Sequence, residues 1–308
     1  MEEVRCRPEG WLLEQGRTPT RERVESAAGT EQVLEGRVLR CTGRHDLEVE
    51  LEGIRGVIPR EEAALGIDTG AVREIAILSR VGRPVSFQVL RVEGEGEQAV
   101  AILSRRRAQE ACLEQLLSQL RPGDVLPARV THLEPFGCFV DIGCGVISLI
   151  SIENISVSRI SHPRDRFTPG QDIRVVVRSV DGPGRRIYVS HKELLGTWLE
   201  NAAAFSPGET VTGVVRSVED YGVFVELAPN LAGLCEYRSD VRPGQWVSVF
   251  LKSILPQRMK VKMLIIGMLP SPPPPQPLHY HFTGEHMDSW EYSPPQCTTR
   301  SIRTDFTT

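Results

Sequence analysis

Two pairs of aromatic residues recur at a fixed spacing in the chain. Phe136 and Phe139 stand three residues apart, and Tyr221 and Phe224 repeat this spacing 85 residues later. Aromatic rings on a protein surface can stack with nucleobases, which contributes about 1–3 kcal/mol per base and does not depend on base sequence. The two pairs therefore predict two platforms for a single-stranded nucleic acid.

The sequence around each pair alternates as a β-strand does. Successive side chains of a strand point to opposite faces, so Cys138 and Val140 share one face and Phe139 lies on the other. The segment 222–227 has the same alternation and leaves Phe224 outside. The alternative is that the rings pack beneath a loop, but their recurrence in both units favours exposed platforms.

The rings belong to a longer repeat. A Pro-Gly turn at Pro122 and another at Pro207 precede the two pairs, again 85 residues apart, so a whole unit is duplicated. A fainter copy lies upstream, where the strand 47–51 keeps the apolar face. Because His45 and Glu48 occupy its ring positions, we expect a barrel there without a platform.

Short β-rich segments separated by Gly/Pro turns predict an all-β fold. Five strands in about 70 residues are typical of the OB-fold, a small and partly open barrel. Segments 105–120 and 192–205 instead show helical spacing of apolar residues. The expected fold is three tandem five-stranded barrels joined by short helices. The predicted divisions are an N-terminal arm (1–31), a degenerate barrel (32–104), a linker helix (105–121), a second barrel (122–191), a linker helix (192–206), a shortened third barrel (207–267) and a proline-rich tail (268–308).

Composition excludes several other classes of protein. The net charge of −4 argues against binding nucleic acid by phosphate neutralisation alone. The seven cysteines are scattered without CxxC spacing, and the tail histidines lack a ligand pattern, so we expect no metal and no cofactor. No apolar run reaches membrane-spanning length, and the start does not resemble a secretory signal. Motifs of phosphate loops, metalloproteases and serine hydrolases are absent, which predicts a cytoplasmic binding protein rather than an enzyme.

The repeated segments FGCFVD (136–141) and YGVFVE (221–226) resemble the S1 domain of the ribosomal protein S1 family. That domain is an OB-fold RNA-binding repeat, and the resemblance covers about residues 32–265. It implies that the ring pairs contact RNA, together with Asp181 and Arg186 late in the second unit and Lys260 in the third. Ser151 and Glu236 stand where the family has a histidine. The acidic Glu236 weakens the expectation of RNA binding most for the third unit.

Local charge supports RNA binding by the second unit. Residues 155–193 hold eight Arg or Lys and four acids, a net charge of +4. Arg159 and His162, in the long loop before the fourth strand, are expected to reach an RNA backbone crossing the platform. The predicted RNA-binding residues are Phe136, Phe139, Arg159, His162, Asp181, Arg185, Arg186, Tyr221, Phe224 and Lys260.

Two functions are consistent with these patterns. The first is single-stranded RNA (mRNA) binding in translation by an S1-like, ribosome-associated protein. The resemblance implies that its first barrel docks on the small ribosomal subunit or its proteins. The second is a protein-interaction scaffold of S1-type barrels in a translation, transcription or RNA-decay complex. The residues Ser151 and Glu236 favour the scaffold, and neither function involves a membrane.

Overall fold

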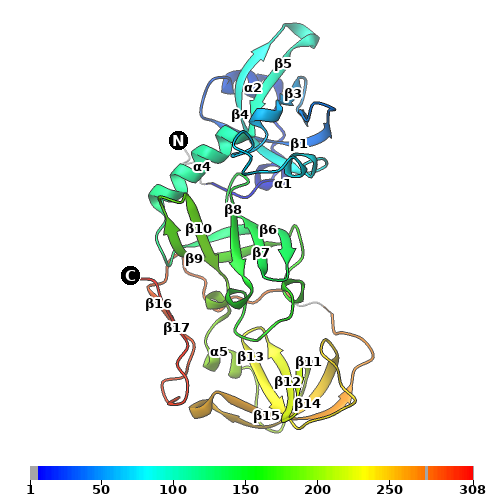
Figure 1. The fold of residues 1–308 in the computed structure, drawn as a ribbon, viewed down its shortest axis with the longest axis vertical. Coiled ribbons are helices and arrows are strands. Elements are labelled where there is room, and N and C mark those ends of the chain that lie inside the picture. The colour runs from blue at the N-terminus through cyan, green and yellow to red at the C-terminus, as the bar shows by residue number, and fades with distance from the viewer. Residues whose placement is uncertain (1–5, 275–276, 308) are drawn as a thin grey trace.

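Three five-stranded β-barrels follow one another along the long axis of the molecule (Figure 1). The computed structural model describes residues 6–274 and 277–307. The all-β architecture of three tandem barrels joined by short helices, expected from the repeats, is confirmed.

The first and third barrels are closed with the same strand order. Barrel 1 runs β1-β2-β3-β5-β4 and barrel 3 runs β11-β12-β13-β15-β14. In each, a parallel pairing, β3 with β5 or β13 with β15, closes the cylinder. The strands are β1 (Val33–Cys41), β2 (Leu47–Glu50), β3 (Arg55–Ile58), β4 (Pro84–Glu93) and β5 (Val100–Ser104), then β11 (Thr210–Glu219), β12 (Gly222–Ala228), β13 (Leu231–Cys235), β14 (Trp246–Leu255) and β15 (Lys260–Met268).

Barrel 2 is a five-stranded sheet that curls almost to closure. Its order is β10-β9-β6-β7-β8. The outer strands meet where the Ser148 hydroxyl donates a hydrogen bond of 2.6 Å to the Ile187 carbonyl. The strands are β6 (Val125–Glu134), β7 (Gly137–Asp141), β8 (Ile147–Ser151), β9 (Asp172–Asp181) and β10 (Arg186–Ser190).

A register shift at the same point of each first strand defines equivalent positions in the three barrels. The shift lies after Val38, Val130 and Val215. Such a bulge inserts one unpaired residue and increases the local twist. The equivalent cross-strand pairs that follow are Arg40–Glu48 in barrel 1, His132–Phe139 in barrel 2 and Ser217–Phe224 in barrel 3.

The expected inward faces fill the barrel cores. Cys138 and Val140 in β7, like Val223 and Val225 in β12, are fully buried. Burial of one aliphatic side chain contributes about 1.5–3 kcal/mol, so these faces fix the register of both platform strands. The outer face then carries Phe139 by geometry alone.

Helices and short turns link the barrels. In α4 (Arg105–Gln119), the Ser104 hydroxyl accepts from the Arg107 amide at 2.9 Å. In α5 (Trp198–Ala202), Thr197 and Glu200 form a capping box. None of the helices in residues 6–274 and 277–307 is long and apolar enough to cross a membrane. The remaining elements are α1 (Trp11–Glu14), α2 (Arg21–Ala27), α3 (Ile75–Leu78), and the 3-10 turns η1 (Arg60–Glu62), η2 (Gly96–Gln98), η3 (Ile152–Asn154), η4 (Pro163–Asp165), η5 (Lys192–Leu195) and η6 (Pro256–Arg258).

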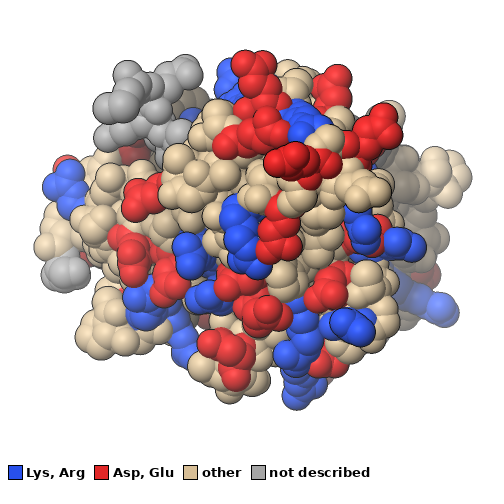
Figure 2. All heavy atoms as spheres, turned by 90° about the horizontal axis from the view of Figure 1, so that it is seen from above, with Lys and Arg blue, Asp and Glu red and all other residues tan. Residues whose placement is uncertain are grey.

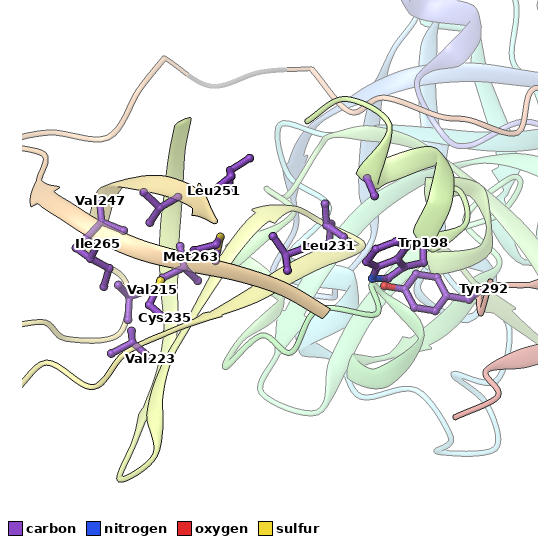
Figure 3. Close-up of a cluster of buried hydrophobic side chains, with 14 of the residues drawn as sticks. Trp198, Val215, Val223, Leu231, Cys235, Val247, Leu251, Met263, Ile265 and Tyr292 are labelled. Carbon is purple, nitrogen blue, oxygen red and sulfur yellow. The ribbon is translucent and has the colours of Figure 1, made fainter. Parts of the chain in front are cut away.

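The proline-rich tail packs onto the chain's own barrels. After the proline segment it returns along barrels 2 and 3 and forms the two-stranded sheet of β16 (Ser289–Glu291) and β17 (Arg303–Asp305). Its buried aromatic residues join the core cluster of barrel 3, where Tyr292 lies beside Trp198 (Figure 3). The Tyr292 hydroxyl donates to the Asn230 carbonyl at 2.6 Å. The aromatic residues of the tail therefore have a binding surface within this chain.

Candidate nucleic-acid interface

The ring pair of barrel 2 forms an exposed aromatic surface. Phe136 is 56% exposed and Phe139 is half-buried. Their ring centroids lie 6.0 Å apart with the planes at 90°, an edge-to-face contact that holds both rings in place. His132, on the neighbouring strand, adds a third ring 6.4 Å from Phe139. Sequence analysis missed His132 because its cross-strand partner depends on the bulge in β6.

Barrel 3 repeats this arrangement. Tyr221 is 69% exposed, and its ring lies 6.1 Å from that of Phe224 at an interplanar angle of 86°. Since β7 and β12 have the same register, the two pairs present the same shape. Each site thus exposes one aromatic ring, which is the arrangement that base stacking can exploit.

Barrel 1 replaces the rings with ion pairs. Glu48, at the position of Phe139, contacts both Arg40 and Arg55 at 2.6 Å. The hydrogen bond from Arg40 is the main reason that the pKa of Glu48 is lowered to about 2. His45, at the position of Phe136, lies 3.2 Å from Glu74. The expectation that barrel 1 lacks a platform agrees with this geometry.

A cleft of about 560 Å³ opens beside the platform of barrel 2, between barrel 1, α4 and barrel 2. Phe139 lines it together with Arg185, Arg186 and Tyr188. The structure thus brings two predicted cations next to a predicted ring, and Tyr188 adds an aromatic side chain that sequence analysis did not select. Its signal was available, because Tyr188 alternates outward between the buried Ile187 and Val189.

Asp181 shapes the turn that carries these arginines. Its carboxylate accepts a hydrogen bond of 2.9 Å from the Gly184 amide, and Arg186 pairs with Asp181 across the β9–β10 ladder. Arg185 has a positive φ of 50° and lies 3.8 Å from Glu110 and from Glu114 on α4. Arg185 is therefore partly neutralised, whereas Asp181 orders the turn.

The long loop of barrel 2 reaches the platform of barrel 3. Arg159 lines a cleft of about 790 Å³ together with Phe224, Lys192 and Arg300. Arg300 comes from the tail, so no local pattern could have placed it here. His162 lies at the start of η4, where its Nδ1 accepts from the Arg164 amide at 3.1 Å.

Three further residues that sequence analysis singled out are Lys260, Ser151 and Glu236. The last two stand at the family's histidine positions. Lys260 is exposed at the start of β15, directly after Met259, which lines the second cleft. Ser151 accepts a hydrogen bond from Asn154 at 2.8 Å. Glu236 forms an ion pair of 2.8 Å with Lys252, which lowers its pKa and offsets its charge. The repulsion of phosphate expected from Glu236 is thereby reduced.

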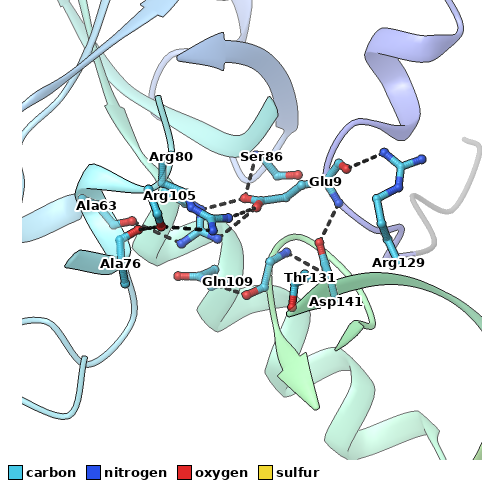
Figure 4. A network of polar contacts seen from close by, with 12 residues as sticks. Glu9, Ala63, Ala76, Arg80, Ser86, Arg105, Gln109, Arg129, Thr131 and Asp141 are labelled. Carbon is cyan, nitrogen blue, oxygen red and sulfur yellow. Dashed lines mark hydrogen bonds and ion pairs between the residues drawn. The ribbon is translucent and has the colours of Figure 1, made fainter. Parts of the chain in front are cut away.

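The carboxylates two residues beyond the platform rings hold the junctions between barrels. Asp141 accepts hydrogen bonds from the Glu9 amide at 2.8 Å and from two glycine amides of its own turn. Glu9 also binds the buried Arg105 side chain at 2.7 Å (Figure 4). Burial raises the pKa of Asp141. In barrel 3, Glu226 binds Arg216 at 2.9 Å and the buried Arg166 of barrel 2. Each platform strand is thus also a junction strand.

Charge at the barrel 1 end of the surface is mixed. Figure 2, which looks onto the barrel 1 end, shows acidic and basic side chains interspersed, without a continuous basic face. The cations that line the two clefts thus lie within a chain whose net charge is −4.

Comparison with known proteins agrees with this architecture. Residues 119–192 match the family described as S1 RNA binding domain. Over 235 residues the chain is 31% identical to the small ribosomal subunit protein bS1 of Staphylococcus aureus, covering 71% of this chain and 58% of that protein. It is 28% identical over 265 residues to the Staphylococcus haemolyticus protein of the same name, covering 81% of this chain and 65% of that protein. The chain therefore spans less than two thirds of these relatives. With three barrels of one design and this match in the second, the chain is an S1-domain repeat protein that is similar to the ribosomal protein S1 family.

Proposed function

We propose that the chain binds single-stranded RNA, with bases stacked on the ring pairs of barrels 2 and 3. The observation that carries the proposal is the repeated geometry: two edge-to-face pairs, at 6.0 and 6.1 Å, each beside a cleft lined by arginine. A merely structural ring would not need to keep this exposure twice. The match to an S1 RNA binding domain supports the same conclusion.

The clefts supply a modest electrostatic contribution. Barrel 2 offers Arg186 beside its rings, and the cleft beside Phe224 of barrel 3 is lined by Arg159, Lys192 and Arg300. Each phosphate neutralised on a single strand changes the logarithmic salt slope by about −0.7. We expect a slope of about −2 to −3, far shallower than that of proteins that bind through charge alone. Stacking then provides most of the affinity and little sequence preference.

In the cell we propose that the chain holds messenger RNA during translation in the cytoplasm, in contact with the small ribosomal subunit. Support comes from the relatives, which are small ribosomal subunit proteins. Barrel 1 is the docking module of this proposal, because ion pairs of Glu48 replace its platform. The second candidate, a protein-interaction scaffold, rests on Ser151 and Glu236 at the family's histidine positions.

Fluorescence anisotropy with a labelled single-stranded RNA tests the proposal at two salt concentrations. The intact chain is compared with the double variant Phe136→Ala, Phe139→Ala. Leu39→Ala is the matched control, because Leu39 is also 56% exposed but lies on barrel 1. Binding that falls in the double variant and persists in the control supports the platform. Absence of binding by the intact chain would instead favour the scaffold.

A further inference from the structure

Three cysteines that are far apart in the sequence meet between barrels 1 and 2. Cys6 comes from the N-terminal arm, Cys112 from α4, and Cys144 from the turn after β7. Their three sulfur atoms all lie within 4.8 Å of one another. Cys112 and Cys144 are buried and Cys6 is half-buried. The cluster lies outside the rings and plays no part in the proposed stacking.

The backbone is shaped tightly around this cluster. Cys144 has a positive φ of 48°, which is rare for residues other than glycine. Its backbone amide donates a hydrogen bond to the Arg7 carbonyl at 2.8 Å. At the preceding Gly143, an added Cβ would lie 2.8 Å from the Cys6 Cβ and 2.9 Å from the Cys112 sulfur. A side chain at position 143 would therefore push the arm and the helix apart.

We propose that Cys6, Cys112 and Cys144 bind one Zn²⁺ ion through their thiolates. Thiolate ligands favour zinc among the common divalent ions, and zinc–sulfur bonds of about 2.3 Å place tetrahedral ligands about 3.8 Å apart, close to the spacing here. Each thiol that coordinates the ion releases its proton to solvent. The amide oxygen of Gln115 lies 3.4 Å from the Cys6 sulfur and is available for the fourth position.

The surroundings offset the charge of such a centre. One zinc ion with three thiolates carries one net negative charge. The guanidinium of Arg105, which is 5% exposed, lies against the same turn, since an added Cβ at Gly145 would collide with its Nη2. A buried anion next to a buried cation is far less costly than either alone. Arg105 also binds the Glu9 carboxylate at 2.7 Å, so it is part of a buried charged cluster beside this turn.

The ion would join three separate parts of the chain. Cys6 and Cys112 are 106 residues apart, and a crosslink that closes a long loop restricts the unfolded chain strongly. Helix α4 also contributes Gln109 and Leu113 to the cleft beside Phe139. Zinc would thus fix barrel 1 against barrel 2 and hold the wall of that cleft in place.

The test is a zinc titration of the intact chain, which is first reduced and stripped of metal. A chromophoric chelator competes with the protein for the ion and reports its affinity. Co²⁺ serves as a second probe, because its thiolate complexes absorb visibly. We expect one equivalent of Zn²⁺ and cobalt–thiolate bands. The Cys112→Ser and Cys144→Ser variants should weaken zinc binding by at least about 100-fold, while Cys297→Ser, a cysteine far from the cluster, should bind normally. No zinc binding at micromolar concentration would overturn the proposal, and so would equal weakening by Cys297→Ser.

Alkylation of the unchanged chain decides the case if a serine variant fails to fold. Bound zinc should protect the half-buried Cys6 from iodoacetamide and leave Cys41 and Cys297 as reactive as in the stripped protein. Mass spectrometry then identifies the modified residues. The chain is also isolated without reductant and tested before any metal is removed. A disulfide between two cysteines of the cluster in that sample would take the place of the zinc site and contradict the proposal. Equal reactivity with and without zinc would also contradict it.

Discussion

One position in the barrel carries three different chemistries. Glu48, Phe139 and Phe224 occupy the same place on equivalent strands, each opposite the first paired residue after the bulge of the neighbouring strand. In barrel 1 the carboxylate binds two arginines, whereas in barrels 2 and 3 a ring contacts a second ring. The backbone register that holds the residue is unchanged, so in the proposed function the side chain at this position decides whether a barrel stacks a base.

Replacing the inner ring of either platform should weaken RNA binding. We expect Phe139→Ala and Phe224→Ala each to lower affinity by about 1–3 kcal/mol, or roughly 5- to 150-fold, because each removes a stacking partner. Anisotropy titrations measure the loss. If one RNA spans both barrels, the double variant should show a larger loss than either single variant. A variant of either ring that binds as the intact chain does would remove that barrel from the interface.

The cations near the rings should act through charge alone. Arg186→Gln is expected to reduce the logarithmic salt slope by about 0.7, because one phosphate contact is lost, and to weaken binding of all sequences alike. Titrations of two unrelated RNA sequences over a salt series measure both effects. Arg185→Gln is the comparison, and should change the slope less because Arg185 already faces Glu110 and Glu114. An unchanged slope for Arg186→Gln would place the RNA backbone elsewhere.

Residue patterns predicted the ring pairs but not their neighbourhood. Alternation along one strand placed Cys138 inward and Phe139 outward, because a strand's faces depend only on local geometry. The contacts of Arg159 and Arg300 with the second cleft depend on how a loop and a tail pack onto another barrel. The cysteine cluster was missed for the same reason, since its members come from three segments and share no spacing motif.

At the level of elements, the tail is held by a buried histidine. His191 is fully buried between the Phe167 and Tyr280 rings. Its Nδ1 lies 3.0 Å from the Ile155 carbonyl, which can only accept, so the proton is on Nδ1. Nε2 then accepts from the Tyr280 hydroxyl at 3.3 Å. A neutral imidazole therefore joins the end of barrel 2 to the tail.

Acid should destabilise this connection. Burial, with a contribution from the Arg166 charge, lowers the pKa of His191 to about 4, so the unfolded chain takes up a proton at higher pH than the folded chain. Stability conferred by neutral His191 is complete above the unfolded pKa of about 6.5 and is lost as pH falls toward 4. The expected loss between pH 8 and pH 5 is about 2 kcal/mol.

Urea unfolding over this pH range measures the effect. In His191→Asn, which keeps a donor for the Ile155 carbonyl but does not titrate, the His191 contribution to the pH dependence should disappear. His279→Asn, an exposed tail histidine, should retain it. A pH dependence that is identical in the intact chain and in His191→Asn would show that His191 does not control acid stability.

At the level of the whole molecule, the junctions between barrels are built from the platform strands. Asp141 follows Phe139 on β7 and faces the N-terminal arm, and Glu226 follows Phe224 on β12 and faces Arg166 of barrel 2. The equivalent Glu50 of barrel 1 is exposed. The outer face that presents a ring thus also receives the preceding barrel, which explains why each cleft lies at a junction and why the barrels form one elongated body (Figure 1).

The buried Glu226 should couple barrels 2 and 3. In Glu226→Gln, Arg166 and Arg216 would lose their shared anion, and removing one partner of a buried ion pair costs about 3–5 kcal/mol. We expect lower stability and a separation of the unfolding of barrel 3 from that of barrel 2, which calorimetry detects as an additional transition. Glu236→Gln is the matched control on the same barrel, because its ion pair with Lys252 is exposed and should contribute little. If both variants unfold as the intact chain does, the junction is not held by Glu226 and the second cleft has no fixed wall.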